Sequence, residues 1–280
     1  MPEMPEVEMV KNAVAPRVTG RRIERLELFD PSVCGHPAAG DFARAVTGRT
    51  VASVARRGKF LRFLLEGGGE LVVHLRMTGV LLACTSDFPE EPHTRAVFHL
   101  SGGVQLRFAD MRRFGRLWLI SPGETDDFTG MDRLGPEPFD PCLTPRWLKE
   151  KLGGSRRAVK TCLLDQSAVA GIGNIYSDEI LFAARIQPQR PACSLTAPEW
   201  KRLAGTIPAL MKFHVEQTAC PPEEYLRTRG REYRNTPYLR VYGHAGEGCP
   251  VCCAKLERVV IGGRSSVFCP KCQPRRSERG

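Results

Sequence analysis

The first half of the chain contains short stretches of alternating apolar and polar residues, the pattern of half-buried β-strands. A helical pattern covers residues 6–13, with Pro5 suited to a first turn. Six extended segments rich in β-branched and aromatic residues follow, at 23–29, 51–65, 71–82, 96–100, 104–108 and 117–120. Strands joined by short turns such as Gly67-Gly68-Gly69 predict an antiparallel β-sandwich preceded by a helix.

The pattern changes near Gly135-Pro136-Glu137-Pro138, where apolar residues begin to recur at helical spacing. Helices are predicted at 145–152, 159–166, 175–184 and 198–217. A chain of 280 residues is long enough for more than one domain. We therefore predict an α+β protein with three parts: a β-sandwich domain over 1–134, a helical domain over 135–239, and a cysteine hairpin with a basic tail over 240–280.

Four of the eleven cysteines form two matching pairs near the C-terminus. They stand in the sequences Cys249-Pro-Val-Cys252 and Cys269-Pro-Lys-Cys272, with sixteen residues between the pairs. This spacing predicts one structural zinc ion on a β-hairpin, because four thiolates close a tetrahedral coordination sphere. Cys253 can compete with its neighbour Cys252, but only Cys252 reproduces the spacing of the second pair.

Positive charge is concentrated at the end of the chain. The formal net charge is +10, and residues 225–280 hold twelve basic residues against four acids, so they carry eight of the ten charges. Tyr225, Tyr233, Tyr238 and Tyr242 are interleaved with these cations, which favours an ordered nucleic-acid surface over a solvated tail. We find no signal peptide and no apolar run of membrane-spanning length, so we expect a soluble intracellular protein.

The N-terminus offers a candidate nucleophile. Aminopeptidases remove an initiator Met before a small side chain, so we expect the mature chain to begin at Pro2. A terminal proline is a secondary amine, and an α-amino group titrates at about 8, well below lysine. It can therefore attack a sugar C1′ at neutral pH and form an iminium that is cationic without a proton. Glu3 follows directly and can serve as the acid or base.

Three further tracts suit DNA binding, although each also has an ordinary structural explanation. In Arg56-Arg57-Gly58-Lys59-Phe60, alternation along a strand puts Arg57 and Lys59 on one face, where either can bind a phosphate. Arg112-Arg113-Phe114-Gly115 combines an apolar wedge with cations, which suits insertion into the space left by an extruded base. Gly171-Ile-Gly-Asn174 opens a helix whose N-terminal amides can hold a phosphate.

Together these tracts resemble the formamidopyrimidine-DNA glycosylase family of base-excision repair enzymes. The resemblance extends over essentially the whole chain and rests on short motifs that occur in the family's order. They are P-E-M-P-E-V-E at 2–8, R-R-G-K-F at 56–60, H-L-R-M-T-G at 74–79, R-R-F-G at 112–115, L-G-P-E-P at 134–138, A-G-I-G-N-I-Y at 170–176, R-V-Y-G at 240–243, and the cysteine hairpin with Arg264 in its G-G-R-S turn.

The resemblance implies an N-terminal β-sandwich, a helix–two-turn–helix domain and a zinc finger, with damaged double-stranded DNA as the partner. It implies a bifunctional glycosylase and AP lyase, which we expect to be a monomer, acting on oxidised purines such as 8-oxoguanine and formamidopyrimidines. Excision through a Schiff base at Pro2 and strand cleavage by β,δ-elimination are implied as well.

The resemblance also implies roles for single residues. Pro2 is the implied nucleophile, Glu3 the acid/base, and Lys59 and Arg264 the contacts to phosphates beside the lesion, with Arg264 linked to the second elimination. His93, Arg112 and Asn174 are implied to contact DNA, and to these contacts we add Arg156 and Lys160. Met77, Arg112 and Phe114 are implied to fill the gap that a flipped nucleotide leaves. The zinc ligands are Cys249, Cys252, Cys269 and Cys272.

The chain departs from the family pattern at three places. Pro92-His93-Thr94-Arg95 replaces K-H-D-H, Asp110-Met111-Arg112-Arg113 replaces D-P-R-R, and residues 218–238, where the lesion-covering loop belongs, are unusually basic. The last difference leaves the preferred damaged base open. The endonuclease VIII branch, which prefers oxidised pyrimidines, normally starts P-E-G-P-E and lacks R-R-F-G, so the chain sides with the purine branch.

Other functions remain as alternatives: a glycosylase of the same family that prefers oxidised pyrimidines, a non-catalytic protein that binds damaged DNA, and a tautomerase-like enzyme with Pro2 as its base. Pro2, Glu3 and Lys59 together argue against a pure binder, and the basic tail argues against a small substrate. Met4-Pro5-Glu6 repeats Met1-Pro2-Glu3, so N-terminal sequencing decides where the chain starts.

Overall fold

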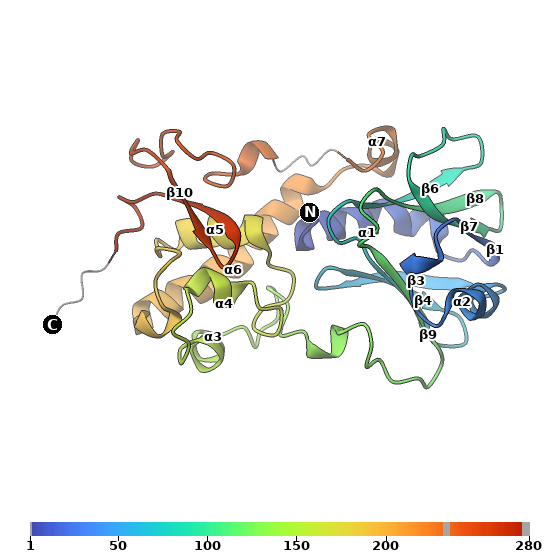
Figure 1. Ribbon diagram of the computed structural model, residues 1–280, viewed down its shortest axis with the longest axis horizontal. Coiled ribbons are helices and arrows are strands. Elements are labelled where there is room, and N and C mark those ends of the chain that lie inside the picture. Colours follow the sequence, from blue (N-terminus) through green and yellow to red (C-terminus); the bar gives the residue numbers. More distant parts are fainter. Residues whose placement is uncertain (1, 232–235, 276–280) are drawn as a thin grey trace. The chain divides into compact units, whose positions relative to one another are not determined.

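The computed structural model describes residues 2–231 and 236–275, which form two compact units (Figure 1). The first unit contains residues 2–132 and 218–231, and the second contains 133–217 and 236–275. Met1, Tyr233 and several charged residues of the basic tail, namely Glu232, Arg234, Arg276, Glu278 and Arg279, lie outside the described residues.

Two β-sheets form most of the first unit. One has the strand order β1-β7-β8-β6, and the other has the order β2-β9-β5-β4-β3. Neighbouring strands are antiparallel except for the short β2, which runs parallel to β9. Phe63, Phe98 and Phe108 are among the side chains of the shared buried core, so the predicted β-sandwich is confirmed. The strands are β1 (Ile23–Leu28), β2 (Cys34–His36), β3 (Val51–Arg57), β4 (Phe60–Leu65), β5 (Glu70–His74), β6 (Gly79–Thr85), β7 (Thr94–Leu100), β8 (Val104–Asp110) and β9 (Arg116–Ile120).

Helix α1 (Met4–Val18) packs against both sheets, through β3 and β4 of one and β6 and β8 of the other. Val7, Val10 and Val14 lie on its buried face. The helix is longer than the predicted span of 6–13, because it begins right after Glu3 and continues through Pro16 in its last turns. The β-sandwich thus holds the N-terminal residues in a defined place.

Several elements of the first unit differ from the sequence expectation. Strand β2 and the helices α2 (Ala39–Val46) and α7 (Pro222–Arg227) are not predicted from the sequence. Residues 51–65 and 71–82 are predicted as continuous strands, whereas each range contains two. The turn between β3 and β4 is Gly58-Lys59, and Gly58 has a φ of +55°, which favours glycine. Lys59 therefore lies in a tight turn, and the placement of Lys59 on a strand face with Arg57 is wrong.

The second unit contains helices α3 (Pro145–Leu152), α4 (Val159–Leu163) and α5 (Asn174–Ala183), most of α6 (Ala197–Thr218), and a hairpin of β10 (Glu257–Ile261) and β11 (Arg264–Phe268). Tyr176, Trp200 and Leu203 are buried in its interior. All the predicted helices are present, although α4 is shorter than the predicted 159–166. Single 3-10 turns occupy Pro31–Val33, Met131–Arg133, Ala192–Ser194 and Thr236–Tyr238.

Residues 218–231 pack with the β-sandwich, although the sequence analysis places them in the helical domain. Tyr225 of α7 is only 3% exposed, and its hydroxyl donates to the carbonyl of Leu81 in β6 at 2.9 Å. The hydroxyl of Thr218 donates to the carbonyl of Pro5 in α1 at 3.4 Å. The basic residues of segment 218–231 predict a surface that binds nucleic acid. They do not indicate that Tyr225 anchors the segment to the β-sandwich.

Candidate functional site

Pro2 and Glu3 are buried at the start of α1. Glu3 and Glu6 form a capping box, in which the amide of Glu3 donates to Glu6 Oε2 at 2.8 Å. The Glu3 side chain is fully buried, so its carboxylate lies where bulk water is excluded. The candidate nucleophile and the candidate acid/base therefore adjoin the rigid first turn of a helix.

The turn that carries Lys59 is fastened to α1. Arg56 Nε donates to Glu8 Oε2 at 2.7 Å, and Arg56 Nη1 donates to the carbonyl of Gly58 at 3.0 Å. Burial raises the pKa of Glu8, but hydrogen bonds from Lys11 and Arg56 outweigh it, so the net pKa is lowered from its ordinary value. An ionised Glu8 thus holds Arg56, and Arg56 holds the turn of Lys59.

His74 lies beside this turn and is uncharged. Its ring meets the ring of Phe60 edge-on, with centroids 4.6 Å apart. Burial, with smaller contributions from the positive charges of Arg76 and Lys59, lowers the pKa of His74 to about 3. The amide of Arg76 donates to His74 Nδ1 at 3.0 Å, so the ring proton resides on Nε2. His74 is a rigid neutral neighbour of Lys59 at physiological pH.

Asp110 organises the loop that follows β8. Its side chain is buried, and Oδ2 accepts a hydrogen bond from the amide of Gly115 at 2.7 Å. Oδ1 accepts from the amide of Arg112 at 3.1 Å and from the hydroxyl of Thr78. A Cβ atom at position 115 would lie 2.5 Å from the ring of Phe108, so only glycine fits there. Residues 111–114 are therefore fixed against the neighbouring turn of residues 75–78.

The loop and the turn expose apolar and cationic side chains together. Met77 is 42% exposed, Met111 60% and Phe114 48%. The guanidinium of Arg112 lies over the ring of Phe114, 4.7 Å from its centroid, in a cation–π contact. A cluster of large exposed apolar side chains marks an interaction surface. Met77, Arg112 and Phe114 are predicted from the sequence, but Met111 is not, although the departure from D-P-R-R at this position was an available signal.

A cavity of about 350 Å³ lies within the first unit beside this surface. His93 lines it, is exposed, and has a left-handed φ of +64°. The structure thus brings His93 and Met77 to one cavity, and it adds Arg231 from the basic segment, which the sequence analysis does not select. The lining residues are Met77, Thr78, Gly79, Val80, Pro92, His93, Ala109, Asp110, Met111, Gly230 and Arg231.

In the second unit, Asn174 is the first residue of α5, directly after the turn that contains Gly171 with a φ of +88°. Asn174 Oδ1 is buried and has no hydrogen-bond partner within the described part of the chain. Its side-chain amide therefore retains hydrogen-bonding capacity for a ligand at the helix N-terminus. Arg156 is exposed in the loop before α4. Asn174 and Arg156 thus lie at positions open to a DNA phosphate, and their contacts with DNA stay a prediction.

Lys160 differs from its expectation, because it is fully buried and cannot reach a DNA phosphate directly. Its Nζ donates to Asp178 Oδ1 at 2.7 Å and to the carbonyl of Ser265 at 3.1 Å. Asp178 also accepts from the hydroxyl of Ser266 at 2.6 Å and from the amide of Val267 at 3.0 Å. Lys160 therefore joins α4 to α5 and to β11, and its charge is balanced inside the unit.

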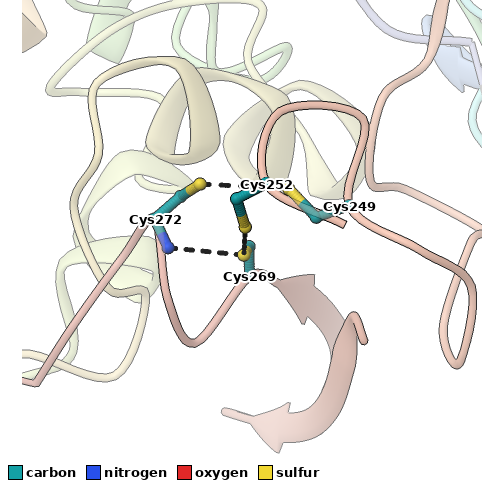
Figure 2. A group of neighbouring side chains, drawn as sticks. All are labelled: Cys249, Cys252, Cys269 and Cys272. Atoms are coloured by element: carbon teal, nitrogen blue, oxygen red, sulfur yellow. Dashed lines mark hydrogen bonds between the residues drawn. The ribbon is translucent and has the colours of Figure 1, made fainter. Parts of the chain in front are cut away.

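The sulfur atoms of Cys249, Cys252, Cys269 and Cys272 all lie within 4.8 Å of one another, and Figure 2 shows the side chains turned toward a common centre. The separations are 3.9 Å between Cys249 and Cys272 and 3.5 Å between Cys252 and Cys269. Four Zn–S bonds of tetrahedral geometry require sulfurs about 3.8 Å apart. The four thiolates thus fit a closed, structural zinc site, and Cys253 is exposed outside the cluster.

The hairpin of β10 and β11 presents Arg264. The two-residue turn Gly262-Gly263 has φ angles of +54° and +73°, and Arg264 begins β11 opposite Ile261. The Arg264 side chain is exposed. Residues 240–242 next to the hairpin donate three backbone amides to the Glu179 carboxylate of α5, at 3.0, 2.9 and 2.8 Å. Burial nevertheless raises the pKa of Glu179.

Comparison with known families covers most of the chain. Residues 1–117 match the formamidopyrimidine-DNA glycosylase N-terminal domain, residues 134–221 match the formamidopyrimidine-DNA glycosylase H2TH domain, and residues 246–275 match a zinc finger found in FPG and IleRS. The chain belongs to the formamidopyrimidine-DNA glycosylase family. The fold class expected from the sequence, with its helix–two-turn–helix region and its zinc finger, is thereby confirmed.

Relatives of known name agree with this assignment. The formamidopyrimidine-DNA glycosylase of Symbiobacterium thermophilum is 44% identical over 98% of this chain and 90% of its own length. That of Moorella thermoacetica is 46% identical, covering 92% of this chain and 94% of the relative.

Solved structures of the same family are similar throughout. The Lactococcus lactis Fpg in complex with DNA containing an abasic site has a TM-score of 0.89 at 32% identity, covering 98% of this chain and all of that one. The Thermus thermophilus protein has a TM-score of 0.85 at 38% identity, covering 99% and 100%. No helix in the described parts of this family member combines the length and apolar character needed to cross a membrane.

Proposed function

We propose that this protein is a bifunctional DNA glycosylase and AP lyase that excises oxidised purines from double-stranded DNA. The observation that carries the proposal is the burial of Pro2 and Glu3 at the capped start of α1, in a chain of the formamidopyrimidine-DNA glycosylase family. Complexes of the Lactococcus lactis Fpg with DNA containing an abasic site or Fapy-dG support it.

The proposed chemistry begins with the secondary amine of Pro2. Its nitrogen forms a bond to the sugar C1′ as the glycosidic bond breaks, and the base leaves with the bonding electrons and takes up the proton that the Pro2 nitrogen loses. Glu3 supplies a proton to the ring oxygen as the sugar opens, which leaves an iminium between Pro2 and C1′. The buried position of Glu3 supports this role, because a carboxyl group shielded from water can exchange its proton with a bound sugar without competition from solvent.

The iminium then serves as an electron sink for two eliminations. Loss of a C2′ proton breaks the C3′–O bond and releases one phosphate, and a second proton loss breaks the C5′–O bond and releases the other. Water hydrolyses the remaining iminium and frees Pro2. Lys59 and Arg264, which are proposed to contact the two flanking phosphates, stabilise the charge on these leaving groups.

DNA binding is proposed to use both units. Asn174 at the N-terminus of α5 and the exposed Arg156 contact phosphates from the second unit, and His93 contacts DNA from the first. Met77, Arg112 and Phe114 enter the space that the flipped nucleotide vacates, as their joint exposure supports. The protein is proposed to act as a monomer on the DNA of the cytoplasm or nucleoid.

A second candidate is a preference for oxidised pyrimidines. The Lactococcus lactis Fpg was solved with DNA containing an oxidised pyrimidine, which favours including this substrate. A non-catalytic damage-binding protein is the remaining alternative, and it requires no terminal amine.

Borohydride trapping tests these proposals in one experiment. Duplexes carrying 8-oxoguanine, a formamidopyrimidine, thymine glycol or an abasic site are incubated with the protein and borohydride. We expect a covalent complex through Pro2 on both purine lesions and on the abasic site, weak trapping on thymine glycol, and none after acetylation of the terminal amine. Pro2→Gly should keep reduced trapping through its primary amine.

Several results of this experiment would contradict the proposal. Equal trapping after acetylation would exclude Pro2 as the nucleophile. Strong trapping only on thymine glycol would establish the pyrimidine preference. Binding without trapping on any duplex would establish the non-catalytic alternative.

A further inference from the structure

The carboxylate of Glu91 holds the basic segment of residues 218–231 on the β-sandwich. The Glu91 side chain is fully buried, and it accepts hydrogen bonds from Arg231 Nη2 and, at 3.5 Å, from Arg229 Nη1. The side chain of Arg229 is 38% exposed, and that of Arg231 is 54% exposed. One buried anion thus fixes two cations that otherwise face solvent.

Glu91 is itself held in place by its own turn. The amide and the hydroxyl of Thr94 both donate to the carbonyl of Glu91, at 3.3 and 2.6 Å. The amide of Asp110 donates to the carbonyl of His93 at 3.0 Å. The same turn therefore aims the Glu91 carboxylate at Arg231 and presents His93 to the cavity described above.

The backbone next to Arg231 is equally constrained. Arg229 and Gly230 both have a left-handed φ, of +53° and +64°, and the amide of Gly230 donates to the carbonyl of Tyr225 at 2.8 Å. A Cβ atom at position 230 would lie 2.6 Å from Tyr225 Oη, so this position requires glycine. Because the Tyr225 hydroxyl is bonded to the carbonyl of Leu81, the backbone at Gly230 and Arg231 is held in place where it lines the cavity.

We propose that Glu91 is a positioning residue, and that the Arg231 it holds at the cavity wall determines which base the cavity accepts. The inference rests on the proposed function, because it takes the cavity to be a place where an extruded base is read. An arginine bound through one nitrogen still carries N–H donors on its others. Bases that have gained carbonyl oxygens through oxidation supply matching acceptors, whereas an abasic site supplies no base at all.

The test compares single-turnover excision of 8-oxoguanine with strand cleavage at an abasic site. Glu91→Gln removes the charge that fixes Arg231, and Arg231→Ala removes the proposed reader. We expect each change to slow 8-oxoguanine excision about tenfold, the effect of one lost charge-assisted hydrogen bond. Cleavage at the abasic site, which also reports on folding, should stay within about twofold of the wild type.

A double mutant and a matched control complete the design. If Glu91 acts through Arg231, the Glu91→Gln/Arg231→Ala protein should excise 8-oxoguanine no more slowly than Arg231→Ala alone. Glu90→Gln removes the same charge from the exposed neighbouring residue and should leave both rates unchanged. Arg231→Lys should recover part of the excision rate, because a lysine keeps the charge and loses the planar fork.

Equal losses on both substrates, or additive losses in the double mutant, overturn the inference and leave the proposed function standing. A wild-type protein that is inactive on both substrates overturns the proposed function and this inference with it.

Discussion

The carboxylate of Asp110 accepts a hydrogen bond from the amide of Gly115 at 2.7 Å and closes the loop of residues 111–114. In Asp110→Ala this amide loses its partner, and a hydrogen bond to a charged group contributes about 1.5–3 kcal/mol. We expect the hydrogen exchange of the Gly115 amide to rise by about ten- to hundredfold, the equivalent of that free energy. Asp127→Ala, at an exposed position, is the control and should leave this exchange unchanged. Unaltered protection in Asp110→Ala would show that the loop is held by other contacts.

The exposed side chains of that loop lead to a second prediction. If Arg112 and Phe114 stabilise an extruded nucleotide, Arg112→Ala and Phe114→Ala should slow the processing of a paired lesion far more than that of an abasic site, where less stacking is disrupted. Single-turnover rates on both substrates measure the difference. Equal losses would return the loop to an ordinary strand-end turn.

Arg264 should contribute to affinity without reading sequence or damage. Loss of one phosphate contact reduces the slope of log affinity against log salt by about 0.9. Arg264→Ala should therefore show this reduction on damaged and undamaged duplexes alike, measured by fluorescence anisotropy over a salt series. Arg258→Ala, on the exposed part of β10, is the comparison within the same hairpin. A change restricted to damaged DNA would assign Arg264 to lesion recognition.

Removal of one zinc ligand should weaken DNA binding by the second unit and leave the first unit folded. A structural zinc contributes about 10–16 kcal/mol to a small domain, so Cys249→Ser or Cys272→Ser should lose the metal and most of the DNA affinity. The β-sandwich has its own core and should stay folded. Cys253→Ser is the matched control, because Cys253 lies outside the thiolate cluster and should not affect metal content. Metal analysis and circular dichroism check both points, and active wild-type protein without zinc would contradict the prediction.

His74 should remain neutral well into the acid range. Its pKa is lowered to about 3, below the ordinary value of about 6.5, so the unfolded chain binds a proton there that the folded chain does not. The stability that this provides is complete above pH 6.5 and decreases as the pH falls toward 3. The His74 Cε1–H resonance should not shift between pH 8 and pH 5. A midpoint near 6.5 would mean that the ring is solvated and charged.

The sequence predicts the β-sandwich, the helical region and the four-cysteine cluster well, because each depends on local patterns. Alternation along strands and the repeated C-P-x-C spacing are visible without knowledge of the tertiary contacts. Pro5 likewise indicates the start of α1, although the length of the helix beyond Ala13 depends on its packing against both sheets.

What the sequence does not reveal depends on contacts between distant residues. From the sequence, Lys160 is predicted to be a surface cation. In the structure it is buried against Asp178 and Ser265, which lie 18 and 105 residues further along the chain. Arg229 and Arg231 are two of several arginines in a basic segment, and only their contacts with the buried Glu91, 138 and 140 residues earlier, distinguish them. The placement of Lys59 fails for a local reason, since a two-residue turn interrupts a continuous run of strand-forming residues.

Helix α5 begins at Asn174 and carries Asp178 and Glu179 one turn later. Asp178 accepts hydrogen bonds from β11, and Glu179 accepts them from residues 240–242. The metal-binding hairpin is therefore held to α5 by hydrogen bonds to a buried side chain. A chimera that takes the hairpin from a relative without a hydroxyl at position 266 loses one donor to the buried Asp178 carboxylate, which then keeps its bonds from Lys160 and from the backbone amide of residue 267. Grafting experiments should cut the chain ahead of α4, so that Lys160 travels with its partners.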